Sequence, residues 1–181
     1  MQRLDNFSLP KGFRGAGVIK VQVWWFVQAT LFSLSPQFAY RWRASLLRLF
    51  GARIGANTVI RPSVTITYPW KVSIGNNSWV GDNAELYSLG EIHIGNNVVV
   101  SQKSYLCTGT HDYQSQAFDI HAKPIIIEDE AWLATDVYIA PGVTIGKGAV
   151  IGARSSVFKN MPAGMICLGS PAKPIKPRLD L

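Results

Sequence analysis

The chain has 181 residues and a formal net charge of +7, which fits one domain plus a short extension. Cys107 and Cys167 lie sixty residues apart, which excludes a zinc module and a disulfide-rich scaffold. Asp5 and polar residues occupy the place where a signal peptide needs its apolar core. We therefore expect a cytoplasmic protein.

The first segment, residues 1–53, holds eight basic side chains against Asp5 alone, whereas residues 54–181 hold ten basic and ten acidic ones. The whole excess of positive charge therefore lies in this extension. Its apolar stretch over residues 21–34 is too short to cross a bilayer, which needs about 20 apolar residues. Ser35 and Pro36 predict the start of a second helix, and Gly51 predicts its end.

Two interpretations of this basic, aromatic-rich extension are compatible with each other. Its helices are expected to cap the open N-terminal end of the following repeats, which would otherwise expose apolar surface and strand edges. Its tryptophans and arginines also suit peripheral contact with anionic lipid at the inner membrane face. Nucleic acid binding is not expected, because no basic stripe continues beyond the extension.

From Ile54 onward, an aliphatic residue returns every six positions. The longest unbroken run is Ile127, Leu133, Ile139, Ile145, Ile151 and Val157. Neither an α-helix nor a simple amphipathic strand has this period. It predicts an all-β solenoid, a parallel β-helix over residues 54–160 with three six-residue units per coil, followed by a C-terminal tail over residues 161–181.

The six-residue repeat is interrupted in two ways. The steps from Ile66 to Ile74 and from Leu86 to Ile94 are eight residues long, which predicts a wider corner on one edge of the solenoid. The step from Ile94 to Ile127 is thirty-three residues, about fifteen more than one coil needs. We expect the excess, residues 107–124, to leave the solenoid as one protruding loop, and such loops are usually functional.

His111 lies at the start of this loop, and it is the leading catalytic candidate. Histidine titrates near neutral pH and can take a proton from a hydroxyl group, which suits a general base. His93 is expected in a corner and His121 late in the loop, each bound only by water.

Residues 54–175 resemble the hexapeptide-repeat acyltransferases. Within that family, these residues are most similar to the sugar acetyltransferases of the colanic-acid-biosynthesis type. Four segments carry the resemblance: Leu106–Tyr113, Ala131–Val137, Ala140–Gly146 and Leu168–Pro174. It implies a left-handed parallel β-helix, assembled as a homotrimer with active sites between subunits. The left hand and the trimer come from the resemblance, because left-handed crossovers break the usual rule for parallel strands.

The resemblance also implies an activity and a set of site residues. His111 would be the general base that takes the proton of a sugar hydroxyl, which then attacks acetyl-CoA directly; backbone N–H groups would stabilise the oxyanion. The co-substrate would lie between subunits, and no metal is expected. The residues implied to bind it are Trp132, Ala134, Thr135 and Ala153 along its groove, and Lys159 and Lys173 at its phosphates.

Two departures of the chain from its relatives concern the acceptor and the general base. The galactoside-type relatives have an acceptor-binding asparagine where this chain has Gly81, so Asn83 and Glu85 nearby are the substitute candidates for acceptor contacts. Asp112 follows His111 where several relatives have proline, and its carboxylate is a candidate for orienting the histidine ring.

The favoured function is therefore O-acetylation of an exopolysaccharide precursor, with a sugar or a lipid-linked sugar as the acceptor. Other small hydroxyl acceptors, such as a free sugar, an oligosaccharide or a serine-like compound, stay open. A zinc enzyme of the γ-carbonic-anhydrase type would need a third histidine at coil spacing. A non-catalytic assembly module would need no base, and Cys107 is a weaker candidate nucleophile for a covalent route.

Overall fold

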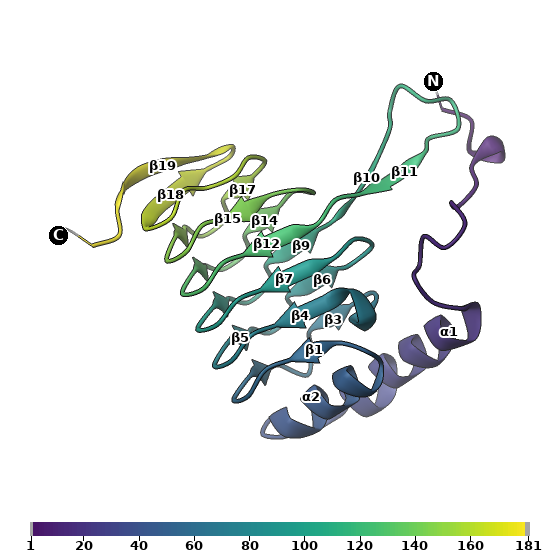
Figure 1. Cartoon of the computed structure of the whole chain (residues 1–181), viewed down its shortest axis with the longest axis horizontal. Coiled ribbons are helices and arrows are strands. Elements are labelled where there is room, and N and C mark those ends of the chain that lie inside the picture. The colour runs from purple at the N-terminus through teal and green to yellow at the C-terminus, as the bar shows by residue number, and fades with distance from the viewer. Residues whose placement is uncertain (1, 180–181) are drawn as a thin grey trace.

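We describe the protein from a computed structural model, which describes residues 2–179 of the chain. Short strands stack into a triangular parallel solenoid, and helices cover its N-terminal end (Figure 1). A single long hairpin leaves the stack at the level of the third and fourth coils. The six-residue repeat thus predicted both the solenoid and its one large protrusion correctly.

Three sheets form the faces of the solenoid, and their strands are parallel except for the last strand of sheet B. Sheet A contains β1 (Arg53–Ile54), β4 (Val72–Ile74), β7 (Ile92–Ile94), β12 (Ile125–Ile127) and β15 (Thr144–Ile145). Sheet B contains β2 (Val59–Ile60), β5 (Trp79–Val80), β8 (Val99–Val100), β13 (Trp132–Leu133), β16 (Val150–Ile151), β18 (Met165–Gly169) and β19 (Ala172–Pro177). Sheet C contains β3 (Thr65–Ile66), β6 (Glu85–Tyr87), β9 (Tyr105–Cys107), β14 (Tyr138–Ile139) and β17 (Ser156–Val157). We call the corner between sheets B and C edge BC, and the corner between sheets C and A edge CA.

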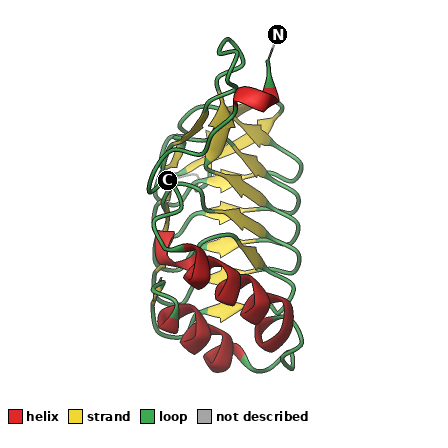
Figure 2. Ribbon diagram, turned by 90° about the vertical axis from the view of Figure 1, so that its right-hand side faces the viewer, coloured by secondary structure: helices red, strands yellow, loops and turns green. Residues whose placement is uncertain are grey.

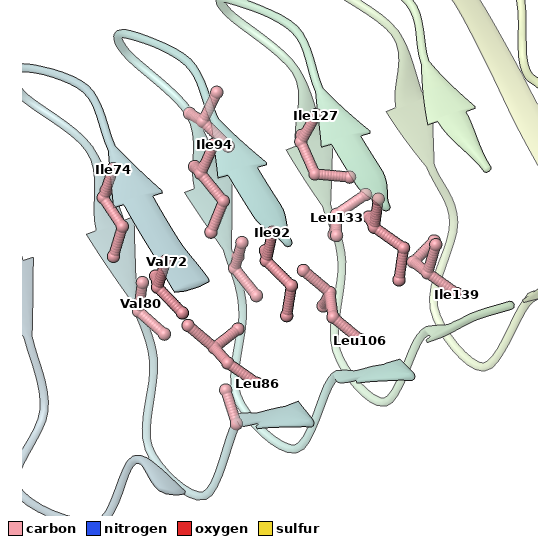
Figure 3. Packing of buried hydrophobic residues seen from close by; sticks show 14 of the residues in the cluster. Val72, Ile74, Val80, Leu86, Ile92, Ile94, Leu106, Ile127, Leu133 and Ile139 are labelled. Carbon is pink, nitrogen blue, oxygen red and sulfur yellow. The ribbon is translucent and has the colours of Figure 1, made fainter. Parts of the chain in front are cut away.

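The repeated aliphatic residues form one apolar column inside the three sheets. Successive side chains of a strand point to opposite faces, so each short strand sends its aliphatic residue inward. Ile74, Ile94 and Ile127 stack directly on one another in sheet A (Figure 3). Leu86 and Leu106 do the same in sheet C, and all five side chains are buried. Burial of such side chains contributes about 1.5–3 kcal/mol each, which makes the column the main source of stability.

Asparagines and glycines shape the corner between sheets A and B. Asn57, Asn77 and Asn97 have left-handed backbone conformations with φ of 55°, 55° and 54°. This matches the tolerance of asparagine for that region. Gly75 has ordinary φ but is closely approached: a Cβ there would lie 2.6 Å from the backbone of Gly95. The sequence pattern therefore has two different physical causes at one corner.

The two eight-residue steps widen edge CA, as the repeat predicted. A 3-10 turn, η3 (Pro69–Lys71), occupies the first wide corner. The Ser88 hydroxyl, in the second wide corner, donates to the Tyr68 carbonyl and accepts from the Tyr68 N–H. The extra residues of successive coils therefore hold one another in register.

The N-terminal extension forms a 3-10 turn η1 (Leu4–Asn6), helix α1 (Val18–Val27) continued by a π-helical turn η2 (Gln28–Phe32), and helix α2 (Tyr40–Leu49). Both helices lie at the end of the solenoid that starts with β1 (Figure 2). Trp24 and Leu47 are buried in the same apolar cluster as the first coils. The Trp24 indole N–H donates to the Ile66 carbonyl at 2.8 Å.

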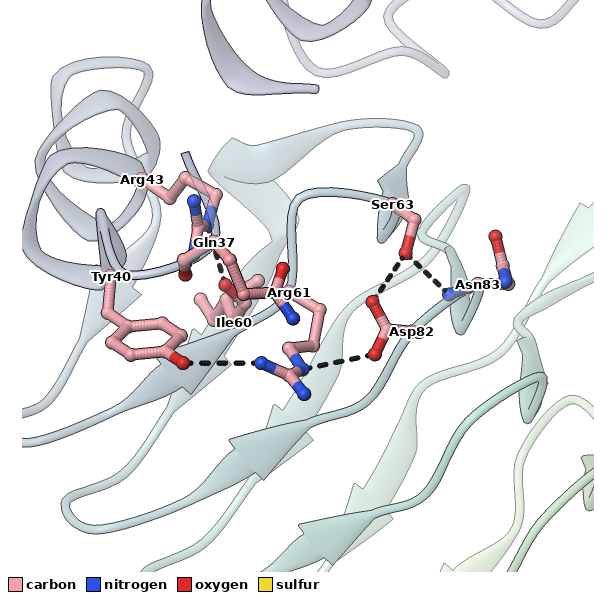
Figure 4. Close-up of polar contacts among 8 residues, drawn as sticks. All are labelled: Gln37, Tyr40, Arg43, Ile60, Arg61, Ser63, Asp82 and Asn83. Atoms are coloured by element: carbon pink, nitrogen blue, oxygen red, sulfur yellow. Dashed lines mark hydrogen bonds and ion pairs between the residues drawn. The ribbon is translucent and has the colours of Figure 1, made fainter. Parts of the chain in front are cut away.

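Helix α2 starts four residues later than Ser35 and Pro36 predicted, at Tyr40. The intervening residues form a turn that Arg43 of α2 fixes from within (Figure 4). This fully buried guanidinium donates to the Ser35 hydroxyl and to the carbonyls of Pro36, Gln37 and Ile60. Gly51, with φ of 101°, lies just after the helix, where the sequence predicted its end.

The C-terminal residues 161–179 continue the solenoid further than the expected boundary at residue 160. Strand β18 pairs in parallel with β16, and Cys167 takes the inward place above Ile151 with no exposed surface. Met161 bridges to Ile145 in the same way. The predicted tail was too long because a methionine and a cysteine, at irregular spacing, replace the aliphatic residues of the repeat.

The last strand, β19, turns back and pairs antiparallel with β18. It thereby covers the outer edge of sheet B. No helix within residues 2–179 has the length and apolar character required to cross a bilayer.

Candidate active site

The protruding segment is an antiparallel β-hairpin at edge CA, and not an irregular loop. Its strands are β10 (Gly109–His111) and β11 (Ile120–Ala122), with His111 opposite Ile120. The Lys123 N–H donates to the Thr108 carbonyl and closes the base. Cys107 still belongs to β9, so the hairpin spans residues 108–123, slightly less than the expected 107–124.

The His111 ring is half-buried on this hairpin and held by Phe118. The two rings stack with centroids 4.0 Å apart and an interplanar angle of 8°. His111 Nδ1 lies 2.8 Å from the Phe118 carbonyl oxygen. A carbonyl oxygen can only accept, so Nδ1 carries the proton of the neutral ring and Nε2 keeps its lone pair. This tautomer is the one that a general base needs.

The N-terminal segment also reaches this hairpin, which the sequence did not predict. The Arg3 N–H donates to the Gln116 carbonyl at 2.7 Å. The Phe7 ring lies 6.1 Å from the His111 ring. Figures 1 and 2 both show the η1 turn beside the hairpin. No periodic pattern in residues 2–17 signals this contact, which depends on the path of the chain after folding.

Asp112 does not contact the histidine ring. Its Oδ1 accepts from the Gln114 N–H at 2.9 Å, and its backbone N–H donates to the Asp119 carbonyl. Adjacent residues of a strand point to opposite faces, which separates the two side chains. The Phe118 carbonyl therefore takes the orienting place that the sequence assigned to Asp112.

A groove of about 630 Å³ lies on the outer face of sheet B and along edge BC. Val59, Trp79 and Val99 form its apolar floor. Asn83, an acceptor candidate, lies on its rim with a left-handed backbone (φ 56°), and Gly81 also lines it.

The sequence analysis missed most of the polar residues that line this groove, including Arg61, Asp82 and Tyr40. Arg61 Nε donates to Asp82 Oδ2 at 3.1 Å, and Arg61 Nη1 contacts the Tyr40 hydroxyl of α2 (Figure 4). Asp82 Oδ1 accepts from the Ser63 hydroxyl. Arg61 and Asp82 are twenty-one residues apart, close to one coil, and that spacing is the only sequence signal that links them.

Glu85 lies elsewhere, on the outer face of sheet C. Its neighbours across the ladder are Thr65 and Tyr105. The aromatic rings of Tyr87, Tyr105 and Tyr138 form a row beside it, with centroids 6.1 and 5.8 Å apart. Burial raises the pKa of the Glu85 carboxyl above its ordinary value. The two acceptor candidates therefore lie on different faces, and only Asn83 lines the groove.

The candidates for binding the co-substrate divide between two edges. Four of them lie together along sheet B and edge BC, directly beyond the groove: Trp132, Ala134, Thr135 and Ala153. The Trp132 indole N–H donates to the Ser101 hydroxyl of the groove. The Arg154 N–H, next to Ala153, donates to the Thr135 carbonyl. Lys159 follows β17 and lies on edge CA, the edge that carries the hairpin. Lys173 lies in β19, opposite Leu168. One subunit therefore does not bring Lys159 and Trp132 to the same place.

The remaining histidine and cysteine candidates have structural partners. His93 lies in strand β7, not in the expected corner, with Nδ1 2.8 Å from the Ser73 hydroxyl and Nε2 2.8 Å from Glu91. His121 lies exposed in β11, across from Thr110. The Cys107 thiol is buried and donates to the Gly109 carbonyl at 3.2 Å, so it is closed off from a substrate. Within residues 2–179 no three histidine, cysteine or acidic side chains come together as a metal site would require.

Comparison with known proteins identifies the family. Residues 124–159 match the family model "Bacterial transferase hexapeptide (six repeats)", and residues 71–102 match "Hexapeptide repeat of succinyl-transferase". The chain is 64% identical over 180 residues to the putative colanic acid biosynthesis acetyltransferase WcaF of Escherichia coli (strain K12), covering 99% of both chains. The chain belongs to the hexapeptide-repeat acetyltransferases.

Two solved structures share the fold of this acetyltransferase. One is a hexapeptide-repeat-containing acetyltransferase of Vibrio cholerae O1 biovar eltor complexed with acetyl coenzyme A, with 26% identity, a TM-score of 0.82 and 92% of each chain covered. The other is a galactoside acetyltransferase in complex with coenzyme A, with 25% identity and a TM-score of 0.83, covering 96% of this chain and 86% of that one. The fold expected from the repeat and the enzyme class implied by the resemblance are both confirmed.

Proposed function

We propose that this acetyltransferase moves an acetyl group from acetyl-CoA to a sugar hydroxyl of an exopolysaccharide precursor, with His111 as the general base. The observation that carries the proposal is the 2.8 Å contact of His111 Nδ1 with the Phe118 carbonyl oxygen, because in the neutral ring this contact leaves the lone pair on Nε2. General-base catalysis requires such a lone pair beside the hydroxyl.

The proposed reaction is a direct transfer. His111 Nε2 takes the proton of the hydroxyl, and the hydroxyl oxygen forms a bond to the thioester carbonyl carbon. The carbon–sulfur bond then breaks, the thiolate of coenzyme A leaves, and the proton on Nε2 neutralises it. No covalent acyl-enzyme is needed, which agrees with the buried, hydrogen-bonded Cys107 thiol.

The position of the candidates supports a site built from two subunits of a homotrimer. His111 and Lys159 lie on edge CA, whereas the groove, Trp132 and Thr135 lie on edge BC. No hairpin residue lines the groove. A complete site would form where edge CA of one subunit meets edge BC of its neighbour, as in closed cyclic assemblies.

In this arrangement the two substrates occupy neighbouring parts of edge BC. The groove beside Asn83, Arg61 and Asp82 would hold the acceptor, and the stretch from Trp132 to Ala153 would hold acetyl-CoA, with Lys159 of the neighbouring subunit and Lys173 at its phosphates. The half-exposed Trp132 indole (43% exposed) offers the flat apolar surface that such a chain needs. The bound states of the related structures support the choice of acetyl-CoA.

The acceptor class rests on the relative with 64% identity, whose name assigns it to colanic acid biosynthesis. We propose a sugar or lipid-linked sugar acceptor, reached in the cytoplasm or at the cytoplasmic face of the membrane. A free sugar or another small hydroxyl compound is the second candidate, favoured by the likeness to a galactoside acetyltransferase.

The test is acetyl transfer to saccharide acceptors, followed by mass spectrometry of the product and by release of the coenzyme A thiol. His111→Ala is expected to lower kcat at least about a hundredfold, the scale of a lost general base. His121→Ala is the matched control, because this histidine lies exposed on the same hairpin, and it should keep nearly full activity. Equal activity of the two variants would refute the assignment of the base.

A further inference from the structure

The N-terminal extension presents a large apolar surface to solvent. Its most exposed large apolar side chains are Ile19 (81%), Phe26 (68%), Leu34 (80%), Phe38 (80%) and Leu49 (78%). Such residues are normally buried, and a cluster of this size on one end of a molecule indicates a contact surface.

The helical periodicity places these side chains away from the solenoid. In α1, Ile19, Val23 and Phe26 recur at the spacing of one helix face, opposite the buried Val21 and Trp24. In α2, Trp42 and Leu49 are seven residues apart on the exposed side, opposite the buried Ala44 and Leu47. Each of these helices therefore has two apolar sides, and only one of them is buried against the solenoid.

The two helices belong to one surface. The Trp42 indole N–H donates to the Leu31 carbonyl at 2.9 Å, which ties the start of α2 to the end of η2. Both helices lie at the same end of the solenoid in two views (Figures 1 and 2). We call this surface the docking face and define it by Ile19, Val23, Phe26, Leu31, Leu34, Phe38, Trp42 and Leu49.

The charge around the docking face is of one sign. From Asn6 to Gly81 the chain has no acidic residue, and its basic residues there are Lys11, Arg14, Lys20, Arg41, Arg43, Arg48, Arg53, Arg61 and Lys71. Of the four on helices α1 and α2, Arg43 is buried, whereas Lys20, Arg41 and Arg48 are exposed. The Lys20 ammonium lies 4.9 Å from the centre of the Trp70 ring, and the Arg48 guanidinium donates to the Ile54 carbonyl. A second copy of this face carries the same positive charge. It could bury the apolar side chains but would not neutralise the basic ones.

We infer that the docking face binds the surface of an anionic lipid bilayer, with the helices lying in the plane of the headgroups. Exposed aromatic and aliphatic side chains would enter the boundary with the acyl chains, and the exposed Arg41 would meet the anionic headgroups. Each basic side chain near an anionic surface contributes about 1 kcal/mol. The helices are too short to cross the bilayer, so the binding is peripheral.

This inference rests on the proposed function in one respect. In a homotrimer with its axis along the solenoid, three docking faces would lie at the same end, and their combined binding would be stronger than that of one. The solenoid would then stand on the membrane, and a lipid-linked acceptor would be held close to the groove.

The test is flotation of the full-length protein with vesicles of phosphatidylcholine, with and without about 30% phosphatidylglycerol, at low and high salt. The wild type should bind the anionic vesicles, more weakly at high salt. The variant Ile19→Ser/Phe26→Ser/Phe38→Ser should bind at least about tenfold more weakly. The matched control, Ile175→Ser/Leu179→Ser, removes exposed apolar side chains from the opposite end and should bind as the wild type does.

Acetyl transfer to a water-soluble saccharide separates this inference from the proposed function. The triple serine variant should keep that activity, and His111→Ala should lose it while still binding vesicles. The inference is overturned if the wild-type protein does not bind anionic vesicles. It is also overturned if the triple variant binds them as strongly as the wild type does. A triple variant that only lowers the assembly size in light scattering also overturns it, since the face would then join copies of the chain.

Discussion

At the scale of single residues, the hairpin shows how a backbone group can select the chemistry of a side chain. The Phe118 carbonyl 2.8 Å from Nδ1 sets the tautomer of His111, and the stacked Phe118 ring sets its orientation. Both come from one residue, seven positions along the chain on the returning side of the hairpin. A carboxylate partner is therefore unnecessary, and Asp112 is free to shape the turn.

Glu85 gives a prediction on pH dependence. Burial raises the pKa of its carboxyl. The ionised carboxylate is therefore less stable in the folded protein than in the unfolded chain. The resulting loss of stability is absent below the unfolded pKa of about 4.5 and develops as the pH rises through the folded pKa. Glu85→Gln should therefore raise the melting temperature at pH 7, and this gain should vanish near pH 4. A gain of the same size at both pH values would contradict the role of burial.

At the scale of elements, the corners decide whether coils stack. Asn97 has φ of 54°, an exposed side chain and a place in the corner between β7 and β8. Its side chain has no hydrogen-bond partner within residues 2–179, so the preference for asparagine at this position comes from the left-handed backbone.

Asn97→Ala should consequently lower the free energy of unfolding by about 1 kcal/mol, the cost of a Cβ in left-handed backbone. Asn97→Gly is the matched variant, since it also removes the amide but tolerates this φ, and it should stay close to the wild type. Urea unfolding at one fixed protein concentration measures both. Equal losses would show that the amide group, and not the backbone, matters here.

The elements also show where sequence patterns are reliable. All fifteen aliphatics that the repeat named from Ile54 to Val157 are buried, because burial in a stacked coil acts on one residue at a time. The repeat did not name the equally buried Val72, Ile92 and Ile125, which precede the inward residue of sheet A by two positions. It stopped short of β18, where Cys167 fills the inward place. Ser35 and Pro36 predicted the start of α2 too early, since Arg43 holds the preceding turn through contacts that no local pattern contains.

At the scale of the whole molecule, the candidate site was only half visible in the sequence. His111 was found because it interrupts a regular pattern. The contact of Phe7 with it, and the Arg61–Asp82 pair in the groove, join segments through the fold and leave no local signal. The division of the candidate residues between edge BC and edge CA likewise leaves no local signal in the sequence.

That division predicts complementation between inactive subunits. Chains with His111→Ala should be mixed, by coexpression, with chains carrying Asp82→Ala/Trp132→Ala, each nearly inactive alone. If every site takes its histidine from one subunit and its groove from the next, random assembly restores about a quarter of the sites. Activity of the purified mixture measures this fraction. A mixture no more active than its two parents would mean that each subunit carries its own site.

The antiparallel return of β19 against β18 has a consequence for the behaviour of the protein in a crowded solution. A parallel solenoid can in principle grow without limit, because its last coil offers the same hydrogen-bonding edge as every coil before it. Here the helices cover the first coil, and β19 occupies the outer edge of sheet B with a strand of opposite direction. An arriving copy finds no parallel edge to extend on that sheet, so the fold limits its own polymerisation into fibres.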